Sequence, residues 1–309
     1  MAAFTKKWKI KKETLIIIIV CIIIAVSLYL LLAPKFGWPM SWQELFDRLN
    51  PSKPKATYSQ NAAAEVHFID VGQGDSALLI SGDKAALIDC GERGSGDAIS
   101  KVLDENGVKK LDFILFSHSD SDHIGGADEV MEKYPTDTIY ADRIPKPTNS
   151  QFDEVVSIAK KSGTKIVAPK DSQFITLGDI TLTVYLPRID NDDENENCII
   201  VMADVIGTDI LFTGDIGTST ESALIEQGYD IDCDILKVGH HGSKGSTSKR
   251  FASATSPEQS VISVGDNNYG HPSEKVIDYL EKVKSKILRT DKLGTVSYNF
   301  SPNQYSLAS

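Results

Sequence analysis

Residues 112–126 read DFILFSHSDSDHIGG, and this stretch constrains the fold more than any other. An apolar run of strand length leads directly into a loop that carries four candidate metal ligands, His118, Asp120, Asp122 and His123. Two glycines then open a segment with helical periodicity, 125–134. Ligands interleaved this closely suit two neighbouring metal ions bridged by one water, as in binuclear hydrolytic sites. An acidic loop with incidental histidines explains the spacing less well.

Two other apolar strands end in residues of the same kind. The stretch ILFTGD ends at Asp215, a carboxylate that could bridge two ions, and ILKVGHH ends at His240 and His241. Alone, these would fit a turn aspartate and a pair of loop histidines. Together with the first loop they form a recurring pattern in which a strand is followed by a ligand loop. Loops at strand ends are where such folds usually build their sites.

The rest of the chain alternates short strands with helical segments. The predicted strands are 66–70, 76–80, 85–89, 112–117, 137–140, 165–169, 180–187, 197–205, 208–215 and 234–239. The predicted helices are 97–107, 125–134, 152–163, 221–228 and 273–284. Two similar halves of strands and helices predict two packed sheets with helices outside, a four-layer αββα sandwich of the α/β class.

Charge limits the partners. Residues 64–309 hold 23 of the 32 Lys and Arg residues and 40 of the 43 Asp and Glu residues, a net charge of −17. A generic nucleic-acid binder shows the opposite balance. The imbalance argues against tight non-specific DNA binding but is compatible with cleavage at a locally positive cleft. Cys90, Cys198 and Cys233 show no CxxC spacing, so we expect buried thiols and no disulfide framework.

An uncharged apolar segment at residues 14–34, TLIIIIVCIIIAVSLYLLLAP, has the length needed to span a bilayer. A buried core helix rarely runs this long without a polar position. A cleaved signal peptide fits less well, because the stretch exceeds the usual apolar length and no convincing cleavage site follows. We therefore predict a retained single-pass signal anchor in the cell membrane.

Flanking charge predicts the orientation of that anchor. Five lysines lie between residues 6 and 12, whereas the other flank carries only a thin scatter of positive charge. This predicts a cytoplasmic N-terminus and an extracellular catalytic domain. The expected organisation is a basic tail (1–13), the anchor (14–34), a juxtamembrane linker (35–63) and a hydrolase domain (64–309).

The order of motifs resembles the metallo-β-lactamase superfamily and, within it, the ComEC-like branch of hydrolase domains. The carrying stretches are HFIDVGQGDSALLI (67–80), ALIDCG (86–91), SHSDSDHIGG (117–126), ENCIIVMADV (196–205), ILFTGDI (210–216), LKVGHHGSKGS (236–246), NNYGHP (267–272) and ILRTDKLGTV (287–296). The resemblance covers nearly all of residues 64–309. It implies the four-layer metallo-β-lactamase fold and a binuclear metallohydrolase.

The resemblance also implies the ligand set. The first metal loop falls on His118, Asp120, Asp122 and His123, the bridging aspartate on Asp215, and the last histidine on His240. Asp120 stands where the common pattern has a second histidine, and Asn197 stands where many members have a metal-binding histidine. Both departures make the first site richer in oxygen ligands, so Mn²⁺ becomes a competitor to Zn²⁺ for the two divalent ions.

Further candidates are assigned more loosely. His241 and His271 are candidates for catalysis beside Asp122: His241 either donates to a substrate phosphate or leaving group or simply forms a nearby hydrogen bond, and His271 either binds substrate or acts as an acid. Candidate substrate contacts are Ser243, Lys244 and Asn197, with Ser246 a further anion contact. Asp70, Asp75 and Asp89 either orient ligands or form turns. His67 and Cys198 are expected to be core residues.

The expected activity is hydrolysis of a phosphodiester, with DNA as the leading substrate by resemblance. One alternative is a cell-surface phosphodiesterase acting on wall or lipid phosphoesters, similar to a phosphorylcholine esterase, which the acidic domain mildly favours. A lactamase-like amidase fits less well because of Asp120 and Asn197. A non-catalytic metal-binding module is the remaining alternative. The residues leave the oligomeric state open.

Overall fold

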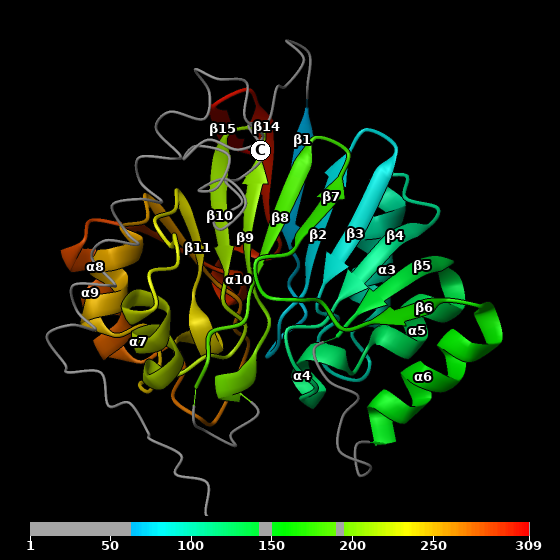
Figure 1. Cartoon of the computed structure of the whole chain (residues 1–309), viewed down its shortest axis with the longest axis horizontal. Helices are drawn as coiled ribbons and strands as arrows, with labels where there is room; N and C mark the ends of the chain where they lie inside the picture. Colours follow the sequence, from blue (N-terminus) through cyan, green and yellow to red (C-terminus); the bar gives the residue numbers. More distant parts are fainter. Residues whose placement is uncertain (1–62, 142–149, 190–194, 309) are drawn as a thin grey trace, which may run out of the picture. The chain divides into compact units, whose positions relative to one another are not determined.

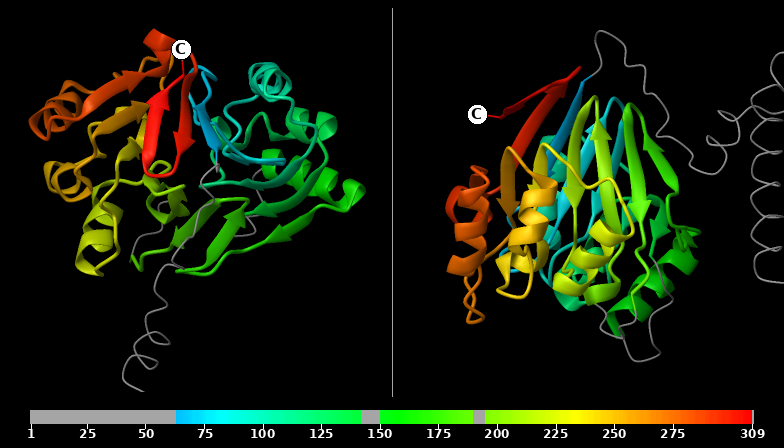
Figure 2. Two further views of the ribbon diagram at one scale, coloured as in Figure 1. Left: turned by 90° about the horizontal axis from the view of Figure 1, so that it is seen from above. Right: turned by 60° about the vertical axis from the view of Figure 1, so that its left-hand side comes forward.

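A computed structural model describes residues 63–141, 150–189 and 195–308. These residues fold into two β-sheets that pack face to face, with helices on both outer faces (Figures 1 and 2). The four-layer sandwich predicted from the sequence is confirmed. No helix in these ranges is long and apolar enough to cross a bilayer, and the predicted anchor at 14–34 lies outside the described residues.

The first sheet has eight strands in the order β15-β14-β1-β2-β3-β4-β5-β6. Their bounds are β1 Ala64–Phe68, β2 Ala77–Ser81, β3 Lys84–Ile88, β4 Leu111–Leu115, β5 Thr136–Tyr140, β6 Lys165–Val167, β14 Val296–Ser301 and β15 Gln304–Leu307. Strands β3 to β6 run parallel to one another, whereas β1 pairs antiparallel with both β2 and β14.

The second sheet has seven strands in the order β13-β12-β11-β10-β9-β8-β7. Their bounds are β7 Phe174–Leu177, β8 Ile180–Tyr185, β9 Ile200–Val205, β10 Thr208–Phe212, β11 Ile235–Lys237, β12 Gln259–Ile262 and β13 Lys286–Arg289. Strands β10 to β13 are parallel. Each sheet therefore has a parallel half, and strands that run parallel deliver their carboxyl ends to one edge.

Helices cover the outer faces and link the parallel strands. They are α3 Gly96–Glu105, α4 Ser121–Ile124, α5 Ala127–Lys133, α6 Ser150–Ser162, α7 Thr218–Glu226, α8 Lys249–Thr255, α9 Glu274–Lys282 and α10 Thr290–Leu293, with 3-10 turns η2 Asn195–Asn197 and η3 Gly239–Gly242. Helices α3, α5 and α6 pack on the first sheet, and α7, α8 and α9 pack on the second (Figures 1 and 2).

Side-chain alternation along the strands explains the layers. In β2, Leu79 points into the core between the sheets, while Leu78 packs under the helices of the first sheet. In β9, Val201 points inward and Met202 outward in the same way. Successive strand residues face opposite sides, so both faces of each sheet must be apolar. The buried strands accordingly carry nearly continuous hydrophobic runs.

Candidate metal centre

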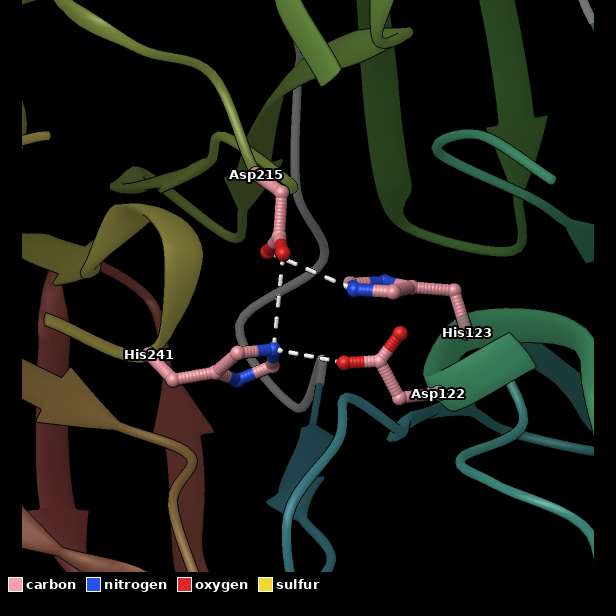
Figure 3. A group of neighbouring side chains, drawn as sticks. All are labelled: Asp122, His123, Asp215 and His241. Carbon is pink, nitrogen blue, oxygen red and sulfur yellow. Dashed lines mark hydrogen bonds and ion pairs between the residues drawn. The ribbon is translucent and has the colours of Figure 1, made fainter. Parts of the chain in front are cut away.

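The carboxyl ends of β4, β10 and β11 meet at one edge of the sandwich, although β4 belongs to a different sheet from the other two. Ligand atoms of Asp122, His123, Asp215 and His241 there lie within 4.8 Å of one another (Figure 3). We call these four residues the compact group. They come from α4, the loop after β10, and η3, so the predicted pattern of strand followed by ligand loop converges on one point.

Asp215 lies at the centre of the compact group. Its Oδ1 is 3.3 Å from His123 Nε2, and its Oδ2 is 3.4 Å from His241 Nε2. His241 Nε2 is also 3.2 Å from Asp122 Oδ2 (Figure 3). The two histidines thus present their Nε2 atoms to the same carboxylate from opposite sheets.

Asp89, at the end of β3, fixes the orientation of His123. Its Oδ2 lies 2.9 Å from His123 Nδ1, and its two oxygens also accept hydrogen bonds from the backbone N–H and hydroxyl of Ser117, both at 2.7 Å. With the Nδ1 proton donated to Asp89, Nε2 is left to face the site, as is usual for metal-binding histidines. The sequence had left Asp89 between an orienting and a turn-forming role, and these contacts fit the orienting role.

His241 is oriented by a different device. Its Nδ1 lies 2.9 Å from the carbonyl oxygen of Ser263, which can only accept, so Nδ1 carries the proton and Nε2 faces Asp122 and Asp215. His240 and His241 both have left-handed backbone conformations, with φ of 49° and 51°. Such a conformation is unfavourable for residues other than glycine and is typical of functional loops.

A buried ion pair lies beneath the histidines. Lys237 Nζ contacts Asp75 Oδ2 and donates to the carbonyl of Val238 at 3.0 Å, while Asp75 Oδ1 lies 3.4 Å from His241 Nδ1. Lys237 was not among the residues predicted from the sequence. The available signal was a lone charge inside the apolar strand ILKVG, because a lysine is almost never fully buried without a partner.

Glycines allow the loops to approach closely. Asp75 N donates to the carbonyl of Asp122 at 3.0 Å, and a Cβ on Gly74 would lie 2.6 Å from that same oxygen. A Cβ on Gly125 would lie 2.3 Å from the backbone nitrogen of Arg93. Side chains at either position would push α4, and with it Asp122 and His123, out of place.

Electrostatic coupling keeps the central carboxylate ionised. Burial alone would raise the pKa of Asp215, but His241 and His123 outweigh this and hold the pKa well below its usual value. Burial would likewise lower the pKa of both histidines, but Asp215 and a second carboxylate beside each ring raise both pKa values well above the ordinary range. Protons therefore occupy the positions around Asp215 that a cation would compete for.

The donor set fits divalent cations. His118 Nε2, His123 Nε2 and Asp215 Oδ1 are buried without a hydrogen-bond partner, which is costly for polar atoms. Imidazole nitrogens and carboxylate oxygens converging in this way are ligands of Zn²⁺ and Mn²⁺. His123 Nε2 and Asp215 Oδ1 lie 3.3 Å apart, and metal coordination would satisfy all three atoms.

His118 and Asp120 lie beside the compact group. The ring of His118 is 4.1 Å from that of His123, centroid to centroid, and its Nε2 is 3.6 Å from Asp120 Oδ2. The neighbouring His118 lowers the pKa of Asp120. The side chain of Asp120 is 44% exposed. We call these two residues the outer pair; Asp120 is more open than any member of the compact group, whereas the His118 side chain is buried.

The two adjacent histidines take different places. His240 Nε2 is 3.6 Å from Asp215 Oδ2, but the side chain is half-buried and lies outside the compact group, which His241 joins instead. His271 is half-buried, with its ring 5.5 Å from that of His240 and 6.5 Å from that of His241. The assignment of the last ligand to His240 and of catalytic roles to Asp122, His241 and His271 stays a prediction.

The remaining candidates are not members of the compact group. Asn197 ends η2, and the neighbouring Cys198 Sγ accepts a hydrogen bond from Asp215 N at 3.4 Å. Ser243 and Lys244 follow η3; the backbone N–H of Ser243 donates to His240, and Lys244 is exposed.

Other candidates have structural roles. Asp70 accepts a hydrogen bond from the N–H of Gly72 within a turn, and the hydroxyl of Ser246 donates to the carbonyl of Gly239. His67 is buried between Glu65 and Ser297, as expected for a core residue. Cys90, Cys198 and Cys233 are buried and free, as predicted.

Comparison with known proteins agrees with this arrangement. The model of the metallo-β-lactamase superfamily matches residues 69–266. ComE operon protein 3 of Bacillus subtilis is 30% identical over 262 residues, covering 78% of this chain and 33% of that protein. Competence protein ComA of Neisseria gonorrhoeae is 33% identical over 250 residues, covering 80% of this chain and 33% of that protein. The chain thus spans about a third of the length of these curated relatives.

A solved structure supports the fold. The metallo-β-lactamase fold protein YhfI from Bacillus subtilis aligns with a TM-score of 0.55 at 17% identity, over 78% of this chain and all of that one. The ligand loops, the family match and these relatives lead to one conclusion: the chain belongs to the ComEC-like branch of the metallo-β-lactamase superfamily.

Proposed function

We propose that this chain is a metal-dependent phosphodiesterase that cleaves DNA. The main observation that supports this activity is the compact group, in which an ionised and buried Asp215 lies between two oriented imidazoles next to Asp122. The relatives named as competence proteins favour DNA as the substrate. Members of the superfamily are generally metal-dependent hydrolases, and the donor set of this chain suits that chemistry.

The compact group would hold one ion, and the outer pair, with Asp215 shared, would help to hold the second. Divalent cations bound there supply a water of lowered pKa and positive charge beside the phosphate that is attacked. The oxygen-rich outer pair makes Mn²⁺ a competitor to Zn²⁺.

The residues of the chain divide the remaining work. Asp89 and the Ser263 carbonyl hold the two imidazoles in place. Asp122, which accepts a hydrogen bond from His241, would orient the attacking water. Burial lowers the pKa of His271, with His240 and His241 adding to the effect, so its ring is neutral near pH 7. A neutral imidazole fits a hydrogen bond to the substrate better than proton donation to the leaving group.

A second candidate function is hydrolysis of a small phosphoester, such as a phosphorylcholine ester. The observation in its favour is the net charge of −17 over residues 64–309, which repels a long polyanion.

We also propose that residues 14–34 anchor the protein with its catalytic domain outside the cell. Digestion of that domain by protease added to intact cells is the expected result, and full protection would contradict it.

A substrate and metal screen tests the activity. The full-length protein, purified in detergent, is stripped with EDTA and then supplied with Mn²⁺ or Zn²⁺. Single-stranded DNA, duplex DNA and p-nitrophenyl phosphorylcholine are offered in parallel. We expect metal-dependent cleavage of DNA. Turnover of the choline ester alone would favour the second candidate, and turnover of no phosphodiester would end the phosphodiesterase proposal.

A further inference from the structure

Tyr269 is an exposed aromatic residue at the rim of the metal centre. It lies in the loop between β12 and α9, and its side chain is 76% exposed. Every other phenylalanine and tyrosine in the described ranges is buried or half-buried. A single exposed apolar side chain is unremarkable by itself.

The loop that carries Tyr269 has a defined conformation. The side chain of Asn267 accepts hydrogen bonds from the backbone N–H groups of Tyr269 and His271, both at 3.1 Å. Its amide nitrogen donates to the carbonyls of Gly265 and His271, both at 2.9 Å. The half-buried side-chain amide of Asn267 thus uses all its hydrogen-bonding groups to hold the turn. The loop therefore holds the backbone of Tyr269 in a defined position.

The same loop is joined to the turn that carries His241. Ser273 N donates to the carbonyl of Gly242 at 2.8 Å, and a Cβ on Gly242 would lie 2.5 Å from Pro272 Cβ. The backbone segments on either side are therefore in close contact. The position of Tyr269 relative to the compact group is fixed by this packing.

Three rings lead from solvent to the metal centre. The ring of Tyr269 lies 5.7 Å from that of His271 at an interplanar angle of 33°. The ring of His271 lies 6.5 Å from that of His241 at 27°. The outer ring is exposed and the inner ring is buried within the compact group. His271 Nδ1, between them, is buried and has no hydrogen-bond partner.

We propose that Tyr269 is a stacking platform for a nucleobase next to the scissile phosphate of single-stranded DNA. The proposal rests on the phosphodiesterase function above and names the substrate class of the same site. Aromatic side chains bind single strands by stacking, which tolerates any base. In a duplex the base faces are covered by their neighbours, so only an unpaired or extruded base can use the platform.

The charge of the domain strengthens this argument. A net charge of −17 over residues 64–309 opposes attraction of the phosphate backbone away from the metal ions. Stacking supplies affinity without positive charge. The alternative ligand, a quaternary ammonium group, is usually enclosed by several aromatic faces. Among the described residues only Tyr269 offers an exposed aromatic ring here, which suits a flat base better.

Substitutions at Tyr269 in the full-length protein test the platform. Tyr269→Ala should raise the KM for single-stranded DNA about 5- to 140-fold, which corresponds to about 1–3 kcal/mol for one stacked base. The kcat should stay unchanged, and Tyr269→Phe should restore the wild-type KM. The matched control is Leu293→Ala, which removes another exposed apolar side chain, in α10, and should leave the KM unaltered.

A change in the DNA provides the second arm. An oligonucleotide with an abasic site beside the cleaved phosphate should lose affinity for the wild-type protein by the same factor. Tyr269→Ala should show no further loss on that oligonucleotide, because both changes remove one interaction. Independent losses that multiply would overturn the proposal. So would an unchanged KM in Tyr269→Ala, or a loss confined to p-nitrophenyl phosphorylcholine.

Binding without turnover separates this proposal from the nuclease function. A single strand containing 2-aminopurine is titrated with metal-free protein, and stacking on Tyr269 should quench its fluorescence. Quenching that is lost in Tyr269→Ala, in a protein that cleaves no DNA, supports the platform while the nuclease proposal fails. Cleavage with quenching equal in both proteins overturns the platform alone. Absence of both cleavage and quenching overturns both proposals.

Discussion

Two almost fully buried carboxylates in this chain have pKa values shifted in opposite directions. Asp215 faces His123 and His241, and these rings keep its pKa well below the usual value despite burial. Glu221, in α7, has no such partner. Burial raises its pKa to about 7, and hydrogen bonds from Ser248 only partly offset this. The facing groups, and not burial alone, decide the charge of a buried acid.

The difference shows which buried acids belong to a binding site. An ionised carboxylate surrounded by imidazoles is ready to bind a cation as soon as the imidazoles release their protons. A buried acid that takes up a proton, as Glu221 does near pH 7, is a structural cost that the fold tolerates. Substitution of each carboxylate, or of the group that faces it, tests this difference.

The largest expected effect comes from Asp215→Asn, which removes the central negative charge but keeps the size of the side chain. Activity should fall by roughly a factor of 10³, because charge placed at the reacting centre is usually the largest catalytic contribution. Metal content, measured by mass spectrometry of the purified protein, should fall with it. Asp232→Asn, at an exposed site in the loop before β11, is the control and should retain both. Full activity in Asp215→Asn would refute the metal centre.

Lys237→Met should cause the largest loss of stability. The substitution leaves the buried Asp75 carboxylate without its ammonium partner, which costs about 3–5 kcal/mol in comparable pairs. Guanidinium denaturation at pH 7 measures the change in the free energy of unfolding. The double variant Asp75→Asn with Lys237→Met should recover much of the loss, while the exposed Lys249→Met should cost almost nothing. If the double variant is as unstable as the single one, the ion pair is not the cause.

Glu221→Gln should stabilise the protein only at higher pH. The pKa of Glu221 is about 7 in the fold, above the ordinary value of 4.5. Ionisation in the fold is therefore penalised, and wild-type stability falls as the pH rises from about 4.5 to about 7, by on the order of 3 kcal/mol. Glutamine cannot ionise, so the gain in the free energy of unfolding of Glu221→Gln over the wild type should be absent near pH 4 and largest near pH 8. Glu226→Gln, on an exposed side chain of the same helix, should show no pH-dependent difference. A pH-independent effect of Glu221→Gln would exclude this origin.

The smallest expected effect comes from Asp120→His. Asp120 is a half-exposed carboxylate, unlike the buried Asp215 and Glu221. Its replacement by imidazole makes the outer pair richer in nitrogen ligands. The preference for Zn²⁺ over Mn²⁺ should rise on the order of tenfold, the low end of what changes around a metal site produce. Competitive metal titration of the stripped protein gives the ratio. An unchanged ratio would mean that Asp120 does not take part in metal selection.

The sequence predicted the layers and the convergence of ligand loops because both follow from local patterns. Continuous apolar runs indicate strands buried on both faces, and His and Asp clusters directly after them indicate the edge of the sandwich that carries the metal centre. Sequence could not decide how His240 and His241 divide their roles. The directions of two adjacent side chains depend on the backbone dihedral angles of their residues. His240 and His241 both adopt the left-handed conformation, which the sequence pattern does not reveal.

Other features depend on contacts between distant segments. Asp75 meets Lys237 only after the two sheets have packed together, and Asp89 meets His123 only after β3 and β4 have paired within the first sheet. Strands β14 and β15 were not predicted, because the short segments at 296–301 and 304–307 gain their identity from pairing with β1 and with each other. The predicted division into tail, anchor, linker and domain stays a prediction, since its first three parts lie outside the described residues.

The pairing of β1 with β14 also sets an order for folding. Ala64 lies opposite Phe300, so this ladder joins residues from the two ends of the domain. Such a long loop closes slowly and late. Until residues near 300 have been synthesised, one side of β1 is an open strand edge with unpaired backbone groups, which invites pairing between chains. Strands β14 and β15 therefore protect this edge against aggregation, and β14 also contributes Val296, Tyr298 and Phe300 to the core.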